Sequence, residues 1–147
     1  MKGITSIGHV AIRVTSFDTA LAFYVGKLGF QEMFRLDREG KLWIIYLRVT
    51  DEQYLELFDE GVGVRAHAPE TTGLNHICLT VDDIDRVIAQ LAALEIPLTR
   101  PKKLAVDGNY QAWCEDPDGN RLELMQMAHD CLHLQAIRRM RLDGVPQ

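Results

Sequence analysis

The chain has 147 residues, 47% of them hydrophobic and 25% charged, with a formal net charge of -5 at pH 7. This composition is typical of one soluble globular domain, and the negative charge disfavours a nucleic-acid partner. No apolar run approaches the roughly 20 residues of a membrane-spanning helix, and no signal-peptide pattern follows Met1. The three cysteines, Cys78, Cys114 and Cys131, have no paired spacing. We therefore expect a cytoplasmic protein with reduced, buried thiols and no membrane contact.

An internal repeat organises the sequence. Residues 9–14 match residues 76–81, and residues 54–58 match residues 121–125 at the same offset without a gap. Each copy therefore has a histidine in its first matched segment and a glutamate in its last. A repeat of this kind predicts two similar structural units.

The first copy, about residues 5–58, is expected to form a βαβββ module. Alternating apolar residues predict a strand over 7–14, and Ser16 is the expected N-cap of a helix with Phe17, Ala20, Leu21 and Tyr24 on its buried face. Three further strands are expected over 30–37, 41–49 and 52–58. Residues 59–73 contain three glycines and a proline and are expected to form a linker.

The second copy, about residues 74–127, repeats the pattern. Asp82 or Asp83 caps a helix whose apolar stripe is Ile84, Val87, Ile88, Leu91 and Leu94. Strands are expected over 98–103, 109–115 and 121–126, with a turn at 116–120. A short C-terminal helix is expected within 129–142. The whole chain, 1–147, is thus expected to be one α+β domain of two tandem βαβββ modules.

Four side chains in this pattern suggest a metal site. Strand alternation turns His9, Glu56, His76 and Glu123 away from the apolar face that each helix covers. Partly enclosed carboxylates need compensation, and a divalent cation supplies it. Two imidazoles and two carboxylates suit a metal such as Zn or Ni, with Co, Fe or Mn also compatible. No phosphate-binding glycine loop or nucleophile elbow is present.

These features resemble the vicinal oxygen chelate superfamily, which includes glyoxalase I, methylmalonyl-CoA epimerase, extradiol dioxygenases and the bleomycin- and fosfomycin-resistance proteins. The resemblance covers about residues 5 to 127. The matching segments are Gly8–Val14, Thr19–Tyr24, Leu28–Phe30, Leu55–Leu57, Asn75–Leu79 and Asp116–Leu124. The resemblance implies the glyoxalase and bleomycin-resistance fold. In the glyoxalase I branch, the metal ligands resemble His9, Glu56, His76 and Glu123.

The resemblance implies a lactoylglutathione lyase-like metalloenzyme. Such an enzyme moves a proton within a vicinal-oxygen substrate, such as the hemithioacetal of methylglyoxal, through a metal-stabilised enediolate. It implies Glu123 as the catalytic base, Glu56 as a possible second base, and Arg13 as a substrate-binding residue. Relatives that use glutathione commonly have an asparagine after the Glu56 position, where this chain has Leu57-Phe58-Asp59-Glu60, so another small-molecule substrate remains open.

Two other functions stay open at this point. One is a metal-free dimer that binds a drug or metabolite, as bleomycin-resistance proteins do, and the other is an extradiol dioxygenase. Trp43, Tyr110 and Trp113 are candidates either for a cavity lining or for the core. We expect a homodimer, because an open concave sheet closes only against another unit. The sequence does not say whether one metal site uses one chain or two.

Overall fold

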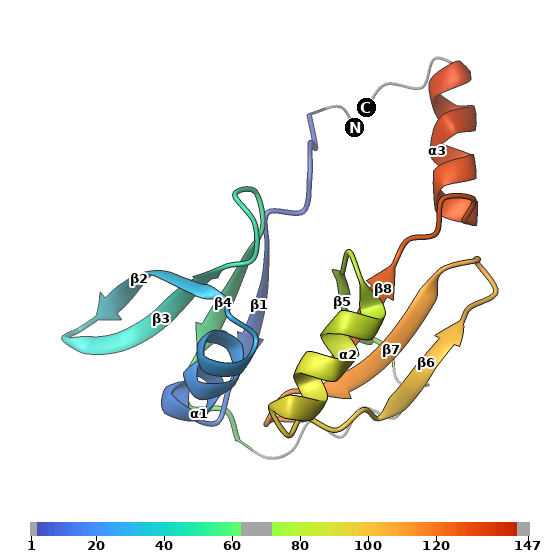
Figure 1. Ribbon diagram of the computed structural model, residues 1–147. Helices are drawn as coiled ribbons and strands as arrows, with labels where there is room; N and C mark the ends of the chain where they lie inside the picture. Colours follow the sequence, from blue (N-terminus) through green and yellow to red (C-terminus); the bar gives the residue numbers. More distant parts are fainter. Residues whose placement is uncertain (1–2, 63–71, 144–147) are drawn as a thin grey trace. The chain divides into compact units, whose positions relative to one another are not determined.

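Figure 1 shows a computed structural model, which describes residues 3–62 and 72–143. The chain divides into two compact units: the first comprises the N-terminal copy with Asp116–Asp118, and the second comprises the rest of the C-terminal copy with the tail. One sheet has the strand order β1-β4-β3-β2 and the other has the order β5-β8-β7-β6. This equivalence confirms the predicted pair of βαβββ modules. Most of the expected linker lies outside the described residues.

The first unit follows the predicted order of elements. These are β1 (His9–Arg13), α1 (Phe17–Leu21), the π-helical segment η1 (Ala22–Lys27), β2 (Gln31–Arg38), β3 (Lys41–Arg48) and β4 (Tyr54–Phe58). The Ser16 side chain accepts a hydrogen bond from the amide of Thr19, so the predicted N-cap is confirmed. The sequence did not predict that the second half of this helix adopts π geometry.

The core of the first unit lies between the helical segment and one face of the sheet. Val14, Ile45, Leu47 and Leu57 are completely buried there. β1 pairs with β4 in parallel, with Ala11 opposite Glu56. β4 pairs with β3 in antiparallel register, with Glu56 opposite Tyr46. The other face of the sheet therefore carries Glu56 and its neighbours.

The second unit repeats this arrangement. Its elements are β5 (Ile77–Thr80), α2 (Ile84–Ala93), β6 (Arg100–Leu104), β7 (Tyr110–Glu115), β8 (Arg121–Gln126) and α3 (Leu132–Leu142). Of the two candidate caps of α2, Asp83 accepts the amide hydrogen of Arg86. Ile84 and Leu91 are buried, whereas Leu94 follows the end of α2 and is 37% exposed. Ile84 and Leu91 are therefore buried as expected, whereas Val87 and Ile88 are half-buried and Leu94 is exposed.

Some local expectations need correction. Cys114 and Cys131 are buried thiols as expected, but Cys78 is exposed because it lies on the face of β5 away from α2. β6 begins two residues later than expected, and α3 begins at Leu132. No residue of α3 is buried. Among the described residues, no helix is long and apolar enough to cross a membrane.

Candidate metal centre

The first histidine–glutamate pair lies on neighbouring parallel strands. His9 begins β1 and Glu56 lies in the middle of β4. His9 Nε2 is 3.6 Å from Glu56 Oε1, with the histidine side chain 51% exposed and the glutamate side chain 9% exposed. A nearly buried carboxylate is thus paired with an accessible imidazole. We call this pair the first half-site.

Tyr46 holds the carboxylate of the first half-site. Its ring stacks on Phe34 with centroids 4.4 Å apart. Its hydroxyl donates a hydrogen bond to Glu56, and this bond, with burial and the carboxylate charge, raises the pKa of Tyr46 above its usual value. The phenol therefore stays protonated at neutral pH and keeps a donor on Glu56.

The second half-site consists of His76 and Glu123. His76 precedes β5 by one residue, and Glu123 lies in the middle of β8. His76 Nε2 is 2.9 Å from Glu123 Oε2, while His76 Nδ1 is 3.0 Å from Asn75 Oδ1. In the tautomer that donates from Nδ1 to Asn75, Nε2 presents its lone pair to the carboxylate. In that tautomer, a divalent cation could accept both the imidazole lone pair and a carboxylate oxygen.

A thiol is the donor beside Glu123, although it lies on β5 and not on the strand that corresponds to the strand of Tyr46. Cys78 on β5 lies opposite Glu123 in the parallel register. Although Cys78 as a residue is exposed, its thiol is partly enclosed; this partial burial, followed by the charge of Glu123 and a hydrogen bond to it, raises the pKa of the Cys78 thiol to about 12. Cys78 is therefore a neutral donor to Glu123 at physiological pH. A thiol is a weaker donor than a phenol.

Trp113 lies against the histidine of the second half-site. The rings of Trp113 and His76 meet edge to face with centroids 4.6 Å apart. The indole Nε1 donates to Gln111 Oε1 over 2.9 Å, which fixes the ring. Trp113 is the repeat equivalent of Tyr46, because the two differ by the same offset as His9 and His76. A buried aromatic ring thus restricts the orientation of this imidazole.

The structure brings the four predicted ligands together in pairs, each histidine with the glutamate of its own copy. In the part of the chain that is described, no group of three or more histidine, cysteine or acidic side chains is arranged to hold a metal ion. A complete four-ligand centre therefore remains a proposal. Sequence reasoning singled out neither Tyr46 nor Cys78 as a site residue. Cys78 lies two residues after His76 on the same strand face, whereas Tyr46 reaches Glu56 only through the pairing of β3 with β4.

The other site candidates lie at different depths. Arg13 is exposed at the end of β1, where its Nη1 donates to the carbonyl oxygen of Asp59 over 2.6 Å. Its guanidinium also lies 5.6 Å from the centre of the Phe58 ring. Trp43 is 40% exposed and Tyr110 38% exposed, whereas Trp113 is 8% exposed. Of the three aromatic residues, only Trp113 is a core residue.

Residues 6–124 match the family described as the Glyoxalase/Bleomycin resistance protein/Dioxygenase superfamily. The chain belongs to this superfamily. The uncharacterised protein YaeR of Escherichia coli (strain K12) is 32% identical over 131 residues, covering 86% of this chain and 99% of that protein. A glyoxalase family protein from Enterococcus faecalis has a similar crystal structure, with a TM-score of 0.72 and 33% identity, covering 82% of this chain and 96% of that one.

A lactoylglutathione lyase is also similar to this superfamily member. The enzyme of Pseudomonas putida is 27% identical over 146 residues, covering 80% of this chain and 83% of the enzyme. The superfamily includes enzymes as well as binding proteins, so membership does not itself assign a reaction.

Proposed function

We propose that the protein is a metal-dependent lyase or isomerase of the glyoxalase I type, acting on a small substrate with two adjacent oxygens. The observation that carries this proposal is the duplication of the half-site. Each copy places a histidine beside a largely buried glutamate, at 3.6 Å in one and 2.9 Å in the other. A binding protein that used no metal would have no need of two such pairs.

The donor set fits a divalent cation. His9 and His76 offer imidazole nitrogens, and Glu56 and Glu123 offer carboxylate oxygens. This mixture suits Zn or Ni, with Co, Fe or Mn also compatible. The hydrogen bond between Asn75 and His76 is of the outer-shell kind that orients a ligating imidazole. We propose that the two half-sites together hold one cation, contributed by one chain or by two.

A bound cation would stabilise negative charge that develops on a substrate oxygen. The protein's own part is to move the proton. We assign this to Glu123, whose carboxylate oxygen takes a proton from the carbon next to a carbonyl group and returns it to the neighbouring carbon. Glu56 accepts from a phenol, which is a stronger donor than the thiol beside Glu123. We therefore assign Glu56 as a metal ligand and as the second candidate base.

Arg13 is the proposed contact for an anionic group of the substrate. It lies on the same strand face as His9. One of its guanidinium nitrogens is held by the Asp59 carbonyl, which fixes the side chain and leaves further N–H donors for a carboxylate. The Pseudomonas putida relative is a lactoylglutathione lyase, so the hemithioacetal of methylglyoxal and glutathione is the first substrate to test.

The test compares metal content with turnover. Protein purified without chelator is expected to contain one equivalent of metal per proposed site, and Glu56→Gln and Glu123→Gln should each lose most of it. Turnover is then measured with Ni or Zn and the methylglyoxal–glutathione hemithioacetal, and with hemithioacetals of other thiols. Full metal content in both variants would overturn the coordination proposal. Metal without turnover on any of these substrates would overturn the reaction.

The matched control is Glu52→Gln. Glu52 is an exposed glutamate just before β4, and its carboxylate takes part in neither half-site. Its replacement removes the same charge as the two test variants and should leave metal content unchanged. A loss of metal in this control would show that net charge, and not ligation, explains the result.

We also propose that the protein is a cytoplasmic homodimer. All eight residues of the edge strand β2 are exposed, and these include Met33, Phe34 and Leu36. Exposed apolar surface of this kind beside Glu56 favours its burial against a second chain. Light scattering on a sizing column should give the mass of two chains. A monomer at micromolar concentration would refute the dimer and leave the half-sites untouched.

A further inference from the structure

An open apolar hollow lies along the second half of α2 and the loop that leads to β6. Its volume is about 470 Å³. Five of its six lining residues are apolar and the sixth is a glutamate: Ile88, Ala92, Ile96, Pro97, Leu98 and Glu95. None of them belongs to a half-site. We call this feature the α2 hollow, and its volume is sufficient for several apolar side chains of a partner.

Glu95 lies at the α2 hollow in a backbone conformation that glutamate rarely adopts. α2 ends in a Schellman motif, in which the Ile96 amide donates to the Leu91 carbonyl over 2.9 Å and the Glu95 amide donates to the Ala92 carbonyl over 3.1 Å. Glu95 has φ of 56°, in the left-handed region where glycine is usual. A negative charge is also unfavourable at a helix C-terminus. Neither the backbone nor the helix dipole therefore favours a glutamate here.

The carboxylate of Glu95 is available to a cation from outside the chain. Glu95 is exposed, and no ion pair within residues 72–143 includes it. The nearby Asp85 differs, because it already pairs with Lys102 at 2.6 Å. The α2 hollow thus combines apolar walls with one unmatched negative charge. This combination fits a partner that carries apolar side chains beside an arginine or a lysine.

The helix α3 has the side chains that this hollow requires. Leu134, Ile137 and Met140 follow one another at intervals of three residues, and Arg141 comes four residues after Ile137, so the four share one face. Ile137 is 41% exposed and Met140 51% exposed. None of the 11 residues of α3 is buried. A helix of this length is marginal by itself in water, which favours a surface that covers its apolar face.

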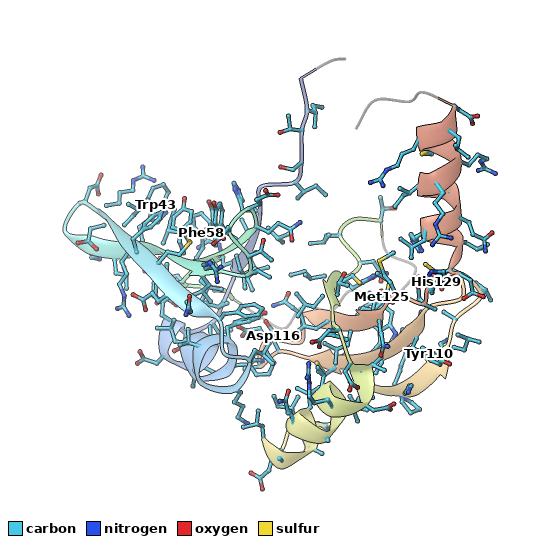
Figure 2. The ribbon with its side chains drawn as sticks, turned by 45° about the horizontal axis from the view of Figure 1, so that its top comes forward. Trp43, Phe58, Tyr110, Asp116, Met125 and His129 are labelled. Carbon is cyan, nitrogen blue, oxygen red and sulfur yellow. The ribbon has the colours of Figure 1, made fainter. Side chains whose placement is uncertain are left out.

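The base of α3 is fixed to the turn between β6 and β7. The Leu132 amide donates to the Asp107 carbonyl over 2.8 Å. The completely buried Asn109 lies in the same turn, with its Nδ2 3.0 Å from Nδ1 of His133. Figure 2 labels His129, which lies just before this fixed end of α3. α3 therefore starts from a defined place in the second unit.

This anchor prevents α3 from filling the α2 hollow of its own chain. The hollow adjoins the residues just before β6, whereas α3 is anchored just after β6. The five residues of β6 span about 17 Å. Figure 1 shows α3 rising away from the end of the unit opposite to the C-terminus of α2. An α3 helix that occupies the hollow must therefore come from another chain.

We propose that α3 of one chain docks in the α2 hollow of a second copy of the chain. Ile137 and Met140 enter the hollow, and Arg141 pairs with the partner's Glu95. A reciprocal exchange fills both hollows by two-fold symmetry and closes the assembly at two chains. The contact joins the C-terminal units and uses no residue of β2 or of the half-sites, so it goes beyond the proposed function.

The test exchanges the two charges in the full-length chain. Glu95→Arg sets an arginine against Arg141 of the other chain, and Arg141→Glu sets a glutamate against Glu95. Each variant has this repulsion at both contacts of the symmetric pair, so the dissociation constant of the contact should rise at least about tenfold. A 1:1 mixture of the two variants has one original pair and one exchanged pair. Both are complementary, so association should return.

The readout is methyl NMR of methionine-labelled protein over a dilution series. The chain has five methionines, and Met140→Leu and Met33→Leu assign the two informative signals. Met140 reports on α3 and Met33 on the separate β2 surface. In the unmodified chain, the Met140 signal should change with concentration and reach saturation. The two charge variants should move its midpoint to higher concentration and leave the Met33 signal unchanged.

Arg139→Glu is the matched control. Arg139 lies in the same last turn of α3 as Arg141 but on the side away from Ile137, so this variant should leave the midpoint unchanged. A Met140 signal that is the same in the unmodified chain and in both charge variants would overturn the proposal. A mixture that associates no better than either variant alone would also overturn it. Neither result affects the metal content and turnover that test the proposed function.

Discussion

Tyr46→Phe is the substitution that most directly tests the environment of the first half-site. It removes one oxygen atom and leaves the ring stacked on Phe34 at 4.4 Å. The lost hydroxyl is a donor to Glu56, whose side chain is only 9% exposed, so water has little access to replace it. Loss of an outer-shell partner typically lowers metal affinity about 10- to 100-fold. We expect the lower end of this range, about tenfold, because one donor on one of four ligands is removed.

The assay is competition for the metal with a chromophoric chelator, together with thermal unfolding of the metal-free protein. The unfolding midpoint should change little, whereas the metal dissociation constant should rise. Tyr54→Phe is the matched control, because the hydroxyl of Tyr54 on the neighbouring strand donates to the Asp51 carbonyl oxygen over 2.8 Å. An unchanged dissociation constant in Tyr46→Phe, or an equal rise in the control, would refute the reasoning.

The pKa of Tyr46 supplies a second readout. Its rise is due mainly to the hydrogen bond with Glu56, and the carboxylate charge also contributes. A cation on Glu56 would offset that charge, so added metal should lower the pKa of Tyr46 in a phenolate absorbance titration. The direction in which pH changes the stability of the fold also follows from this raised pKa. The raised pKa stabilises the fold below the ordinary tyrosine pKa, and this contribution is lost as pH rises through the folded value.

Three further predictions concern the core, the thiol and a helix cap. Leu57→Ala removes a completely buried side chain and should lower the free energy of unfolding, measured by chemical denaturation, by about 2–5 kcal/mol. The control is Leu104→Ala, whose side chain is 61% exposed and whose loss should change that free energy by about 0.5 kcal/mol or less. In metal-free protein at pH 8, Cys78 should be alkylated at least about tenfold more slowly than a thiol with a pKa of 9.0, because the smaller thiolate fraction outweighs the greater nucleophilicity of a more basic thiolate. Glu123→Gln should accelerate the reaction, and a rate like that of a free thiol would contradict the raised pKa. The stabilisation associated with this raised pKa is present below about pH 9 and is lost as pH rises towards 12. Asp83→Ala removes the cap of α2 and should cost about 1 kcal/mol, measured by thermal unfolding.

The sequence was sufficient to predict the two modules, because the repeat and the strand alternation depend only on residue order. The same alternation placed Glu56 and Glu123 on the face away from the helices. The register in the structure agrees, with Glu56 opposite Tyr46 and Glu123 opposite Cys78. Alternation alone could not predict which side chain of the neighbouring strand lies opposite each glutamate. That depends on strand pairing, which single-strand patterns do not contain.

The local errors have a similar cause. The stripe on α2 predicted five buried positions, but Ile88 lines a surface hollow together with Ala92 and Ile96. A helical stripe gives the direction of the apolar face, whereas its depth depends on how much of the sheet lies beneath it. The π geometry of Ala22–Lys27 was likewise not predicted, because its hydrogen bonds involve no distinctive residue type.

The edge strand β2 has a consequence for how the protein avoids aggregation. Its sequence intersperses Glu32, Arg35, Asp37 and Arg38 with apolar residues, and Glu32 and Arg35 form an ion pair on the strand itself. Charged gatekeepers of this kind discourage a foreign strand from extending the sheet at its open border. The same strand nevertheless exposes Phe34 on its flat side. Association across that flat side is thus favoured over fibre-like growth along the border, so the unit can expose apolar surface for a partner while remaining resistant to uncontrolled polymerisation.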